Sequence, residues 1–274
     1  TTRRTTRATP SASPATEQTA THMIGRVVLA ALLAGIAAGL VMGAIQQVRL
    51  TPLILAAETY ERAGHAAESD DAAAVPDAEA QPGAPAHAEG HDHDHAKVDV
   101  SEGWTPADGW QRTLATTVTA ALAGAGFAAV LAAISLISGL PVTRQNGWIW
   151  GLCGFLAVSL APSAGLPPEL PGMPSADLYS RQVWWVATIA LTGAGIYLLA
   201  ARKENWTIIP ALILIAAPHV IGAPLAVNEQ TNLPPGLVSA FASNSLAANA
   251  VFWMLNGLFL GLVLDRTAKD IYAT

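Results

Sequence analysis

The feature that most constrains this chain is a series of apolar stretches long enough to cross a lipid bilayer. Spanning the hydrocarbon layer takes about 20 apolar residues in a helix. Within lipid every backbone N–H and C=O must be bonded inside the protein, which favours α-helices. The sequence therefore predicts an all-α, polytopic integral membrane bundle with six transmembrane helices, or five if one of two proline-flanked stretches does not cross. The stretches lie at about residues 24–48, 112–139, 147–165, 182–200, 207–226 and 237–264.

Composition agrees with a membrane protein that carries a polar insert. Only 12% of the 274 residues are charged, against about 25% in soluble domains. The single Cys153 excludes an internal disulfide and a Cys-based metal site. The net charge of −6 with scattered Lys and Arg argues against nucleic-acid binding. Phosphate-loop, His-Glu-x-x-His and Gly-x-Ser-x-Gly motifs are absent from the sequence, so we expect no enzymatic activity of those kinds and no covalent cofactor.

Two segments are expected to lie outside the membrane bundle. Residues 1–22, rich in Thr, Ser, Ala and Arg, are predicted to be a disordered tail or a start extension before Met23, which leaves 23–274 as the membrane domain. The long loop 49–111 holds many Ala, Pro and acidic residues between about 66 and 100, a composition that predicts disorder. At its beginning, Pro52 to Tyr60 is predicted to be a short amphipathic helix that continues the first span.

The positions of the basic residues predict the orientation. With the N-terminus inside, nine of the fourteen Lys and Arg lie on the inner side, and sixteen of the twenty acids lie on the outer side. Basic residues in short loops favour the cytoplasmic side. We therefore expect a protein of the bacterial inner membrane with both termini in the cytoplasm and the loop 49–111 periplasmic or extracellular.

A histidine-rich run in that loop is the sharpest candidate for metal chemistry. Imidazole and carboxylate together suit divalent transition metals. In an extended chain alternate side chains face one way, yet the outer ones lie too far apart to share an ion, so the segment must curl around the metal. A solvated polar tract that binds metal only incidentally is the alternative. The candidate ligands are His87, His91, His93, His95, Asp92 and Asp94.

Polar residues inside the apolar stretches form a second candidate. His219 lies in the fifth stretch between Pro218 and further prolines, which predicts a kinked or broken helix with free carbonyls. An ionisable residue beside such backbone is one way to build an ion path, whereas a neutral His bonded to a neighbouring helix is the alternative. Asn249 and Asn256 share one helical face, which predicts either coordination or interhelical hydrogen bonds. A small-residue stripe in the first stretch predicts close helix packing and consists of Gly35, Gly39 and Gly43.

Three acids near the outer ends of the spans could guide a cation. Glu58 and Glu61 lie three apart on one side of the predicted helix, and Glu169 lies in a proline-rich turn before Arg181. Glu169 could pair with Arg181 or meet an incoming cation. Each of the three could also be an ordinary surface acid.

Several of these segments resemble the CbtA family of cobalt transporter subunits. The matching segments cover about Met23 to Arg266 outside the loop interior, and the run Leu-Pro-Pro-Glu-Leu-Pro-Gly is the most specific of them. The resemblance implies an inner-membrane protein that takes up cobalt, with about five spans and often with a small His-bearing single-span partner, CbtB. The matching residues are Pro52–Leu55, Ala57-Glu58, Tyr60-Glu61, Leu160–Pro162, Leu166–Gly172, Arg181-Gln182, Trp184-Trp185, Pro218-His219, Gly222–Pro224, Asn249-Ala250 and Phe252-Trp253.

Together these features predict a membrane subunit that takes up a divalent transition-metal ion. Co²⁺ is favoured, and Ni²⁺ or Zn²⁺ would suit the same ligands. The histidine-rich loop would capture the ion as substrate, the three acids would guide it, and His219 with the Asn face would line its path. A non-transporting accessory or structural subunit of a membrane complex remains an alternative. A membrane metalloenzyme is a further one, which the flexible loop ligands disfavour. The lipid bilayer and a CbtB-like subunit are the expected partners.

Overall fold

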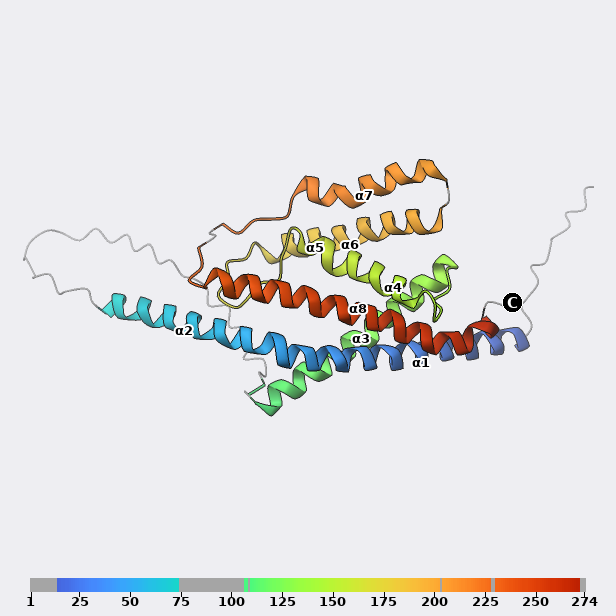
Figure 1. Cartoon of the computed structure of the whole chain (residues 1–274), viewed down its shortest axis with the longest axis horizontal. Helices are drawn as coiled ribbons and strands as arrows, with labels where there is room; N and C mark the ends of the chain where they lie inside the picture. Colours follow the sequence, from blue (N-terminus) through green and yellow to red (C-terminus); the bar gives the residue numbers. More distant parts are fainter. Residues whose placement is uncertain (1–13, 74–105, 108, 203, 228–229, 272–274) are drawn as a thin grey trace, which may run out of the picture.

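The described part of the protein is a bundle of antiparallel helices. The structure is a computed structural model that describes residues 14–73, 106–107, 109–202, 204–227 and 230–271. α2 continues α1 and α5 continues α4, and the helical segments otherwise alternate in direction. The beginning of α1 and the end of α8 therefore lie at the same end of the molecule (Figure 1). We call the end with the loop segments 164–177, 222–227 and 230–234 the loop end. The helices are α1 (Pro14–Ile45), α2 (Thr51–Ala73), α3 (Trp110–Ser138), α4 (Gly147–Gly154), α5 (Ala161–Ser163), α6 (Leu178–Ala201), α7 (Ile208–Ile221) and α8 (Pro235–Ile271).

Three short turns of other helical types connect these helices. The π-helical turn η1 (Gln46–Leu50) joins α1 to α2, and the π-helical turn η2 (Phe155–Leu160) joins α4 to α5. A 3₁₀ turn, η3 (Asn205–Thr207), precedes α7. The predicted continuation of the first span is confirmed, because α2 follows α1 without a break in the helix.

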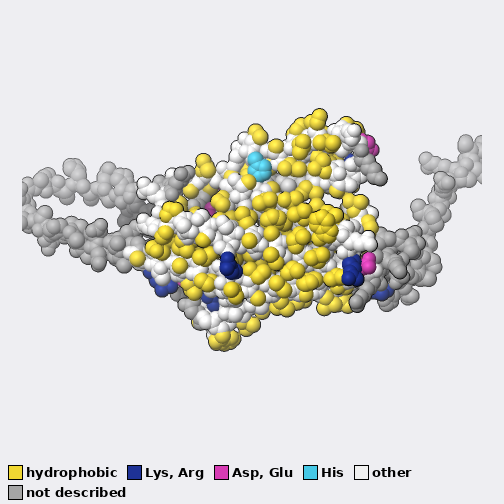
Figure 2. Space-filling model, in the orientation of Figure 1, with side chains coloured by type: hydrophobic (Ala, Val, Ile, Leu, Met, Phe, Trp, Pro, Cys, Tyr) yellow, Lys and Arg dark blue, Asp and Glu magenta, His cyan; other side chains and the backbone are white. Residues whose placement is uncertain are grey.

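Four helices of the described chain are long and apolar enough to cross a membrane, and they correspond to the first, second, fourth and sixth predicted stretches. The remaining two stretches, which prolines flank, form the shorter apolar helices Gly147–Ser163 and Asn205–Ile221. Many large apolar side chains are exposed on α1, α3, α6 and α7. The face in Figure 2 is accordingly mostly hydrophobic with few charges. An apolar surface of that extent is typical of contact with lipid or with other membrane helices.

The first helical rod extends further at both ends than hydropathy predicts. α1 begins at Pro14, so residues 14–22, which we expected to be a disordered tail, are helical. Proline is tolerated in a first helical turn, and lengthening an existing helix is far easier than starting one. At the other end α2 continues to Ala73 because Ala, Glu and Arg are good helix formers even where the chain is no longer apolar. The expected disorder between 74 and 100 and in residues 1–13 lies outside the described residues.

The core lies between α1, α3, α4 and α8, which pack closely through small residues. A Cβ atom at Gly35 or Gly39 of α1 would overlap the backbone of α3, and one at Gly147 of α4 would overlap α8 at Gly257. The prediction that the glycine stripe of α1 serves close packing is therefore confirmed.

The α6–α7 hairpin packs on the side of this core. α7 lies mainly against α6, and α6 reaches the core through η2 and α5 (Figure 1). Asp177 caps α6 by accepting hydrogen bonds from the backbone N–H and the hydroxyl of Ser180, both at 2.9 Å. These two bonds favour the ionised carboxylate and lower the pKa of Asp177.

Candidate functional site

The acids predicted to guide a cation lie at the loop end, and two of the three are paired with arginine. The carboxylate of Glu58 on α2 accepts a hydrogen bond from Arg112 of α3 at 2.7 Å, and a longer one from Arg62 at 3.4 Å. Glu169, in the proline-rich loop, lies 2.8 Å from Arg181 of α6. Of the two roles considered for Glu169, the structure shows the pairing with Arg181. All four side chains of the two shorter ion pairs are about a quarter exposed.

Glu61 lies beside the turn that ends the proline-rich loop. Gly172 adopts a positive φ of 80°, which suits glycine, and its ideal Cβ position is 3.7 Å from Cβ of Glu61. Leu170 anchors the same loop because its side chain is buried in the core and its backbone N–H donates a hydrogen bond to the sulfur of Met173. The loop is therefore seated against α2, and Glu61 itself is exposed.

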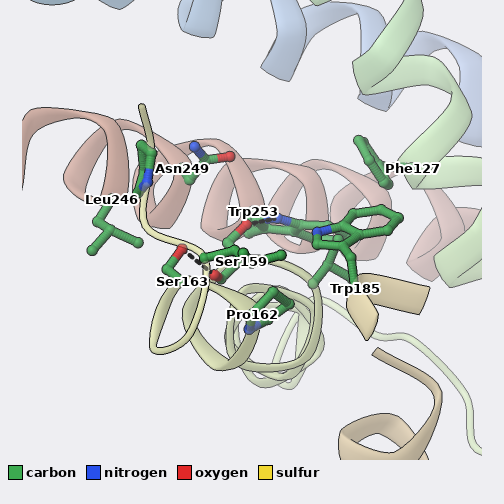
Figure 3. Close-up of a pocket in the computed structure, with 11 residues that line it drawn as sticks. Phe127, Ser159, Pro162, Ser163, Trp185, Leu246, Asn249 and Trp253 are labelled. Carbon is green, nitrogen blue, oxygen red and sulfur yellow. Dashed lines mark hydrogen bonds between the residues drawn. The ribbon is translucent and has the colours of Figure 1, made fainter. Parts of the chain in front are cut away.

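A cavity of about 250 Å³ lies where the α6–α7 hairpin meets the core. Its wall combines residues from four helices, the turn η2 and the proline-rich loop (Figure 3). Glu169 directly follows the lining residue Pro168, and Arg181 lies one helical turn before Trp185, so their ion pair is adjacent to this cavity. The lining residues are Phe127, Val158, Ser159, Pro162, Ser163, Leu166, Pro168, Trp185, Leu246, Asn249 and Trp253.

The polar and the aromatic side chains occupy different parts of the wall. In Figure 3 Ser159, Ser163 and Asn249 gather on one side, and Phe127, Trp185 and the ring of Trp253 lie on the other. Several polar hydrogens are already used within the wall. The indole N–H of Trp253 donates to Ser159 Oγ at 3.1 Å, the hydroxyl of Ser163 donates to the Ser159 carbonyl at 2.6 Å, and the amide of Asn249 donates to the Ser245 carbonyl at 3.0 Å.

Local sequence explains why this wall forms. Gly154 has no side chain where the ring of Trp253 lies against the α4–η2 segment, and any Cβ there would overlap that ring. The π-helical turn η2 then presents Val158 and Ser159 to the cavity. Such π-helical turns are frequent at functional sites. The buried Pro162 lies in the short helix α5 (Ala161–Ser163). The chain then leaves the helix and continues as the proline-rich loop.

His219 does not line the cavity to which Asn249 contributes. It lies exposed in the last turn of α7, where its ring meets the edge of Trp184 with centroids 6.0 Å apart. α7 is one continuous helix through Pro218 rather than a broken one, and it ends at Gly222, whose φ is 89°. The carbonyl of Pro218 accepts hydrogen bonds from the Trp184 indole at 3.1 Å and from the Gly222 N–H at 3.0 Å, so it is not free for an ion.

The two asparagines of α8 have different surroundings. Asn249 lines the cavity. Asn256 is completely buried two turns further along α8, and its amide donates to the Phe252 carbonyl at 3.0 Å. Its Oδ1 atom has no hydrogen-bond partner among the described residues. The structure therefore brings one of the two predicted asparagines to the cavity.

The histidine-rich candidates His87, His91, His93 and His95, with Asp92 and Asp94, lie outside the described residues. Among the residues that are described, His, Cys, Asp and Glu form no group of three that could hold a metal ion. Sequence reasoning missed Ser159 and Ser163 as site residues. The signal was present, because these two serines lie four apart immediately before the proline-rich run and so share a helix face.

Comparison with known families now identifies the chain. The model of the CbtA family, described as a probable cobalt transporter subunit, matches residues 24–265. The chain belongs to the CbtA family. The match includes every residue that lines the cavity, together with the two arginine-paired acids. No curated protein and no solved structure matches the chain.

Proposed function

We propose that this CbtA-family chain takes up a divalent transition-metal ion, with cobalt as the preferred substrate, and that the loop histidines capture it. The observation that carries this proposal is the family match over residues 24–265, since the family consists of probable cobalt transporter subunits. The neutral, oxygen-bearing cavity within the bundle supports it, because an ion path needs polar groups inside an apolar protein.

The outer position of the loop 49–111 would give capture a physical basis. Most of the acids of the chain lie in that loop and at the loop end, so their field would concentrate cations at the entrance. Glu58, Glu61 and Glu169 lie at the loop end and would guide the ion inward. Entry into a negative interior is favoured by about 2.3 kcal/mol per charge per 100 mV, so a divalent ion would need no nucleotide hydrolysis.

The capture role is tested by replacing His87, His91, His93 and His95 together with Gln. We expect the cobalt concentration at half-maximal uptake to rise while the maximal rate stays unchanged, because a flexible chelator supplies ions but does not form the path. Accumulation by cells that express the chain is measured element by element with mass spectrometry. Replacement of Asp92 and Asp94 by Asn in a separate variant measures the carboxylate contribution. An equal loss of uptake at all cobalt concentrations contradicts capture.

A second candidate is a subunit that assists a transporting partner without transporting on its own. The family description as a subunit favours it, as does the lack of a three-ligand group among the described residues. The partner would then be a small single-span, His-bearing protein of the CbtB type. Proteoliposomes that contain the purified chain alone separate the two functions: cobalt flux into them supports transport, and no flux supports the accessory role.

A further inference from the structure

The cavity at the junction between hairpin and core offers a specific kind of chemistry. No Asp, Glu, His, Lys or Arg is among the described residues that line it. Its polar groups are two hydroxyls and one carboxamide, those of Ser159, Ser163 and Asn249. One hydroxyl hydrogen, that of Ser163, one amide hydrogen of Asn249 and the Trp253 indole hydrogen are already bonded to other protein groups. Oxygen lone pairs therefore outnumber free hydrogens in the cavity.

A wall of this kind favours a ligand that donates hydrogen bonds. An anion would find few donors there, whereas a cation or a shell of oriented water would meet the lone pairs of the three polar side chains. The rings of Trp185 and Trp253 on the opposite wall add to this preference, because aromatic faces attract cations. The cavity is thus better suited to positive than to negative solutes.

The same wall cannot strip a divalent ion of its water. Removing charge from water is costly unless charged or strongly coordinating ligands replace the hydration shell. Hydroxyl and carboxamide oxygens without a carboxylate or imidazole do not supply that replacement. Six waters occupy roughly 180 Å³ at about 30 Å³ each. The cavity volume of about 250 Å³ exceeds that of six waters.

We propose that this cavity holds the divalent cation in its hydrated form, with water hydrogens donating to Ser159, Ser163 and Asn249. This inference rests on the proposed transport function and specifies the form of the substrate. It has a consequence for selectivity, since oxygen contacts to a water shell respond to charge and size and not to the identity of the metal. The choice of cobalt over similar ions must then be made elsewhere in the protein.

Hexaamminecobalt(III) is the probe that tests the proposal. Its six ammonia ligands do not exchange, and its N–H groups imitate the hydrogens of a hydrated ion. The purified full chain in lipid nanodiscs, at physiological salt to screen the surface acids, is titrated with the complex by calorimetry. We expect saturable binding with one site per chain. We also expect the complex to compete with Co²⁺ uptake into proteoliposomes.

Cavity variants assign that binding to the cavity. Ser163→Ala combined with Asn249→Leu should weaken binding of the complex by about tenfold or more, because at least two hydrogen bonds are lost. Ser243→Ala is the matched control, since Ser243 is an exposed serine of α8 with the same hydroxyl bond, to the Ser239 carbonyl at 2.7 Å. Asn249→Asp should strengthen binding instead, and a gain of affinity cannot come from misfolding.

The outcomes separate the two proposals. The hydrated form is supported if the double variant loses binding of the complex, Ser243→Ala retains it and Asn249→Asp strengthens it. No binding, or binding that none of the cavity variants changes, overturns it. Cobalt uptake is scored on its own: uptake without cavity-dependent binding refutes only the hydrated form. A lack of uptake into cells and into proteoliposomes refutes the transport function itself.

Discussion

At the loop end, the negative charges of Glu58 and Glu169 are each balanced by the positive charge of an arginine. Each pairs with an arginine from the first turn of the next helix, Arg112 in α3 and Arg181 in α6. A positive side chain at a helix N-terminus is unfavourable with respect to the helix dipole, and the neighbouring carboxylate offsets it. Each carboxylate is therefore held in place by its arginine, and an incoming cation would have to compete with that arginine for the carboxylate oxygens.

Arg181→Gln tests whether Glu169 serves cations or only structure. We expect a loss of about 1 kcal/mol in stability, followed as a lower thermal unfolding midpoint, because the pair is only partly buried. We also expect half-maximal uptake at a lower cobalt concentration, since the carboxylate is freed. Adding Glu169→Gln should abolish that gain in uptake. Arg202→Gln, at the opposite end of α6, removes the same charge without touching Glu169, and the same effect there would contradict the guiding role.

Sequence alone predicted the residue types at the loop end better than those in the cavity. The pairing of Glu169 with Arg181 follows from opposite charges that flank a rigid proline turn. The spacing of Ser159 and Ser163 gave only a weak signal, because a serine in a helix can satisfy its hydroxyl on the preceding turn. Only the packing of Trp253 over Gly154 shows that they line a cavity.

At the scale of elements, hydropathy located the helices but not their irregularities. The stretch predicted at 112–139 is α3 (Trp110–Ser138), and the one at 147–165 is the segment Gly147–Ser163. The π-helical turns η1 and η2 depend on tertiary packing and have no period of their own in the sequence. The exposed position of His219 was also hidden, because α7 is apolar on every side and periodicity cannot show which face packs.

Gly39→Ala tests the close contact between α1 and α3. The new methyl group would overlap the backbone at Ala120, so the helices must separate, at a cost of about 1–3 kcal/mol. We expect a lower thermal unfolding midpoint in detergent. Gly25→Ala is the matched control in the same helix, because nothing lies within 4 Å of its Cβ position. A drop of the same size in both variants would mean that the contact with α3 is not the cause.

At the scale of the whole molecule, the alternation of helices puts the two ends of the described chain on one side. The basic residues likewise predict both termini on one side of the membrane (Figure 1). The loop 139–146 with Arg144 lies at the opposite end from the proline-rich loop. Import requires the histidine-rich segment to lie outside the cell membrane, and the positive loop to lie inside.

Cysteine labelling tests that orientation. In a Cys153→Ala background, Ala88→Cys should react with a membrane-impermeant maleimide in intact cells, because loop 49–111 is expected outside. Gln145→Cys should react only after the cells are permeabilised, since it neighbours Arg144 on the predicted inner side. Mass spectrometry of the labelled chain reports both. The reverse pattern would place the histidines in the cytoplasm and contradict uptake.

The attachment of the α6–α7 hairpin has a mechanical consequence. α6 reaches the core mainly through η2 and α5, and Trp185 is the hairpin residue in the cavity wall. The other lining residues belong to α3, α8 and the segment from η2 to the proline-rich loop. A small rigid-body tilt of the hairpin would therefore move only the Trp185 side of the cavity and so widen or narrow the cavity. The four tightly packed helices beneath it would keep their glycine contacts throughout.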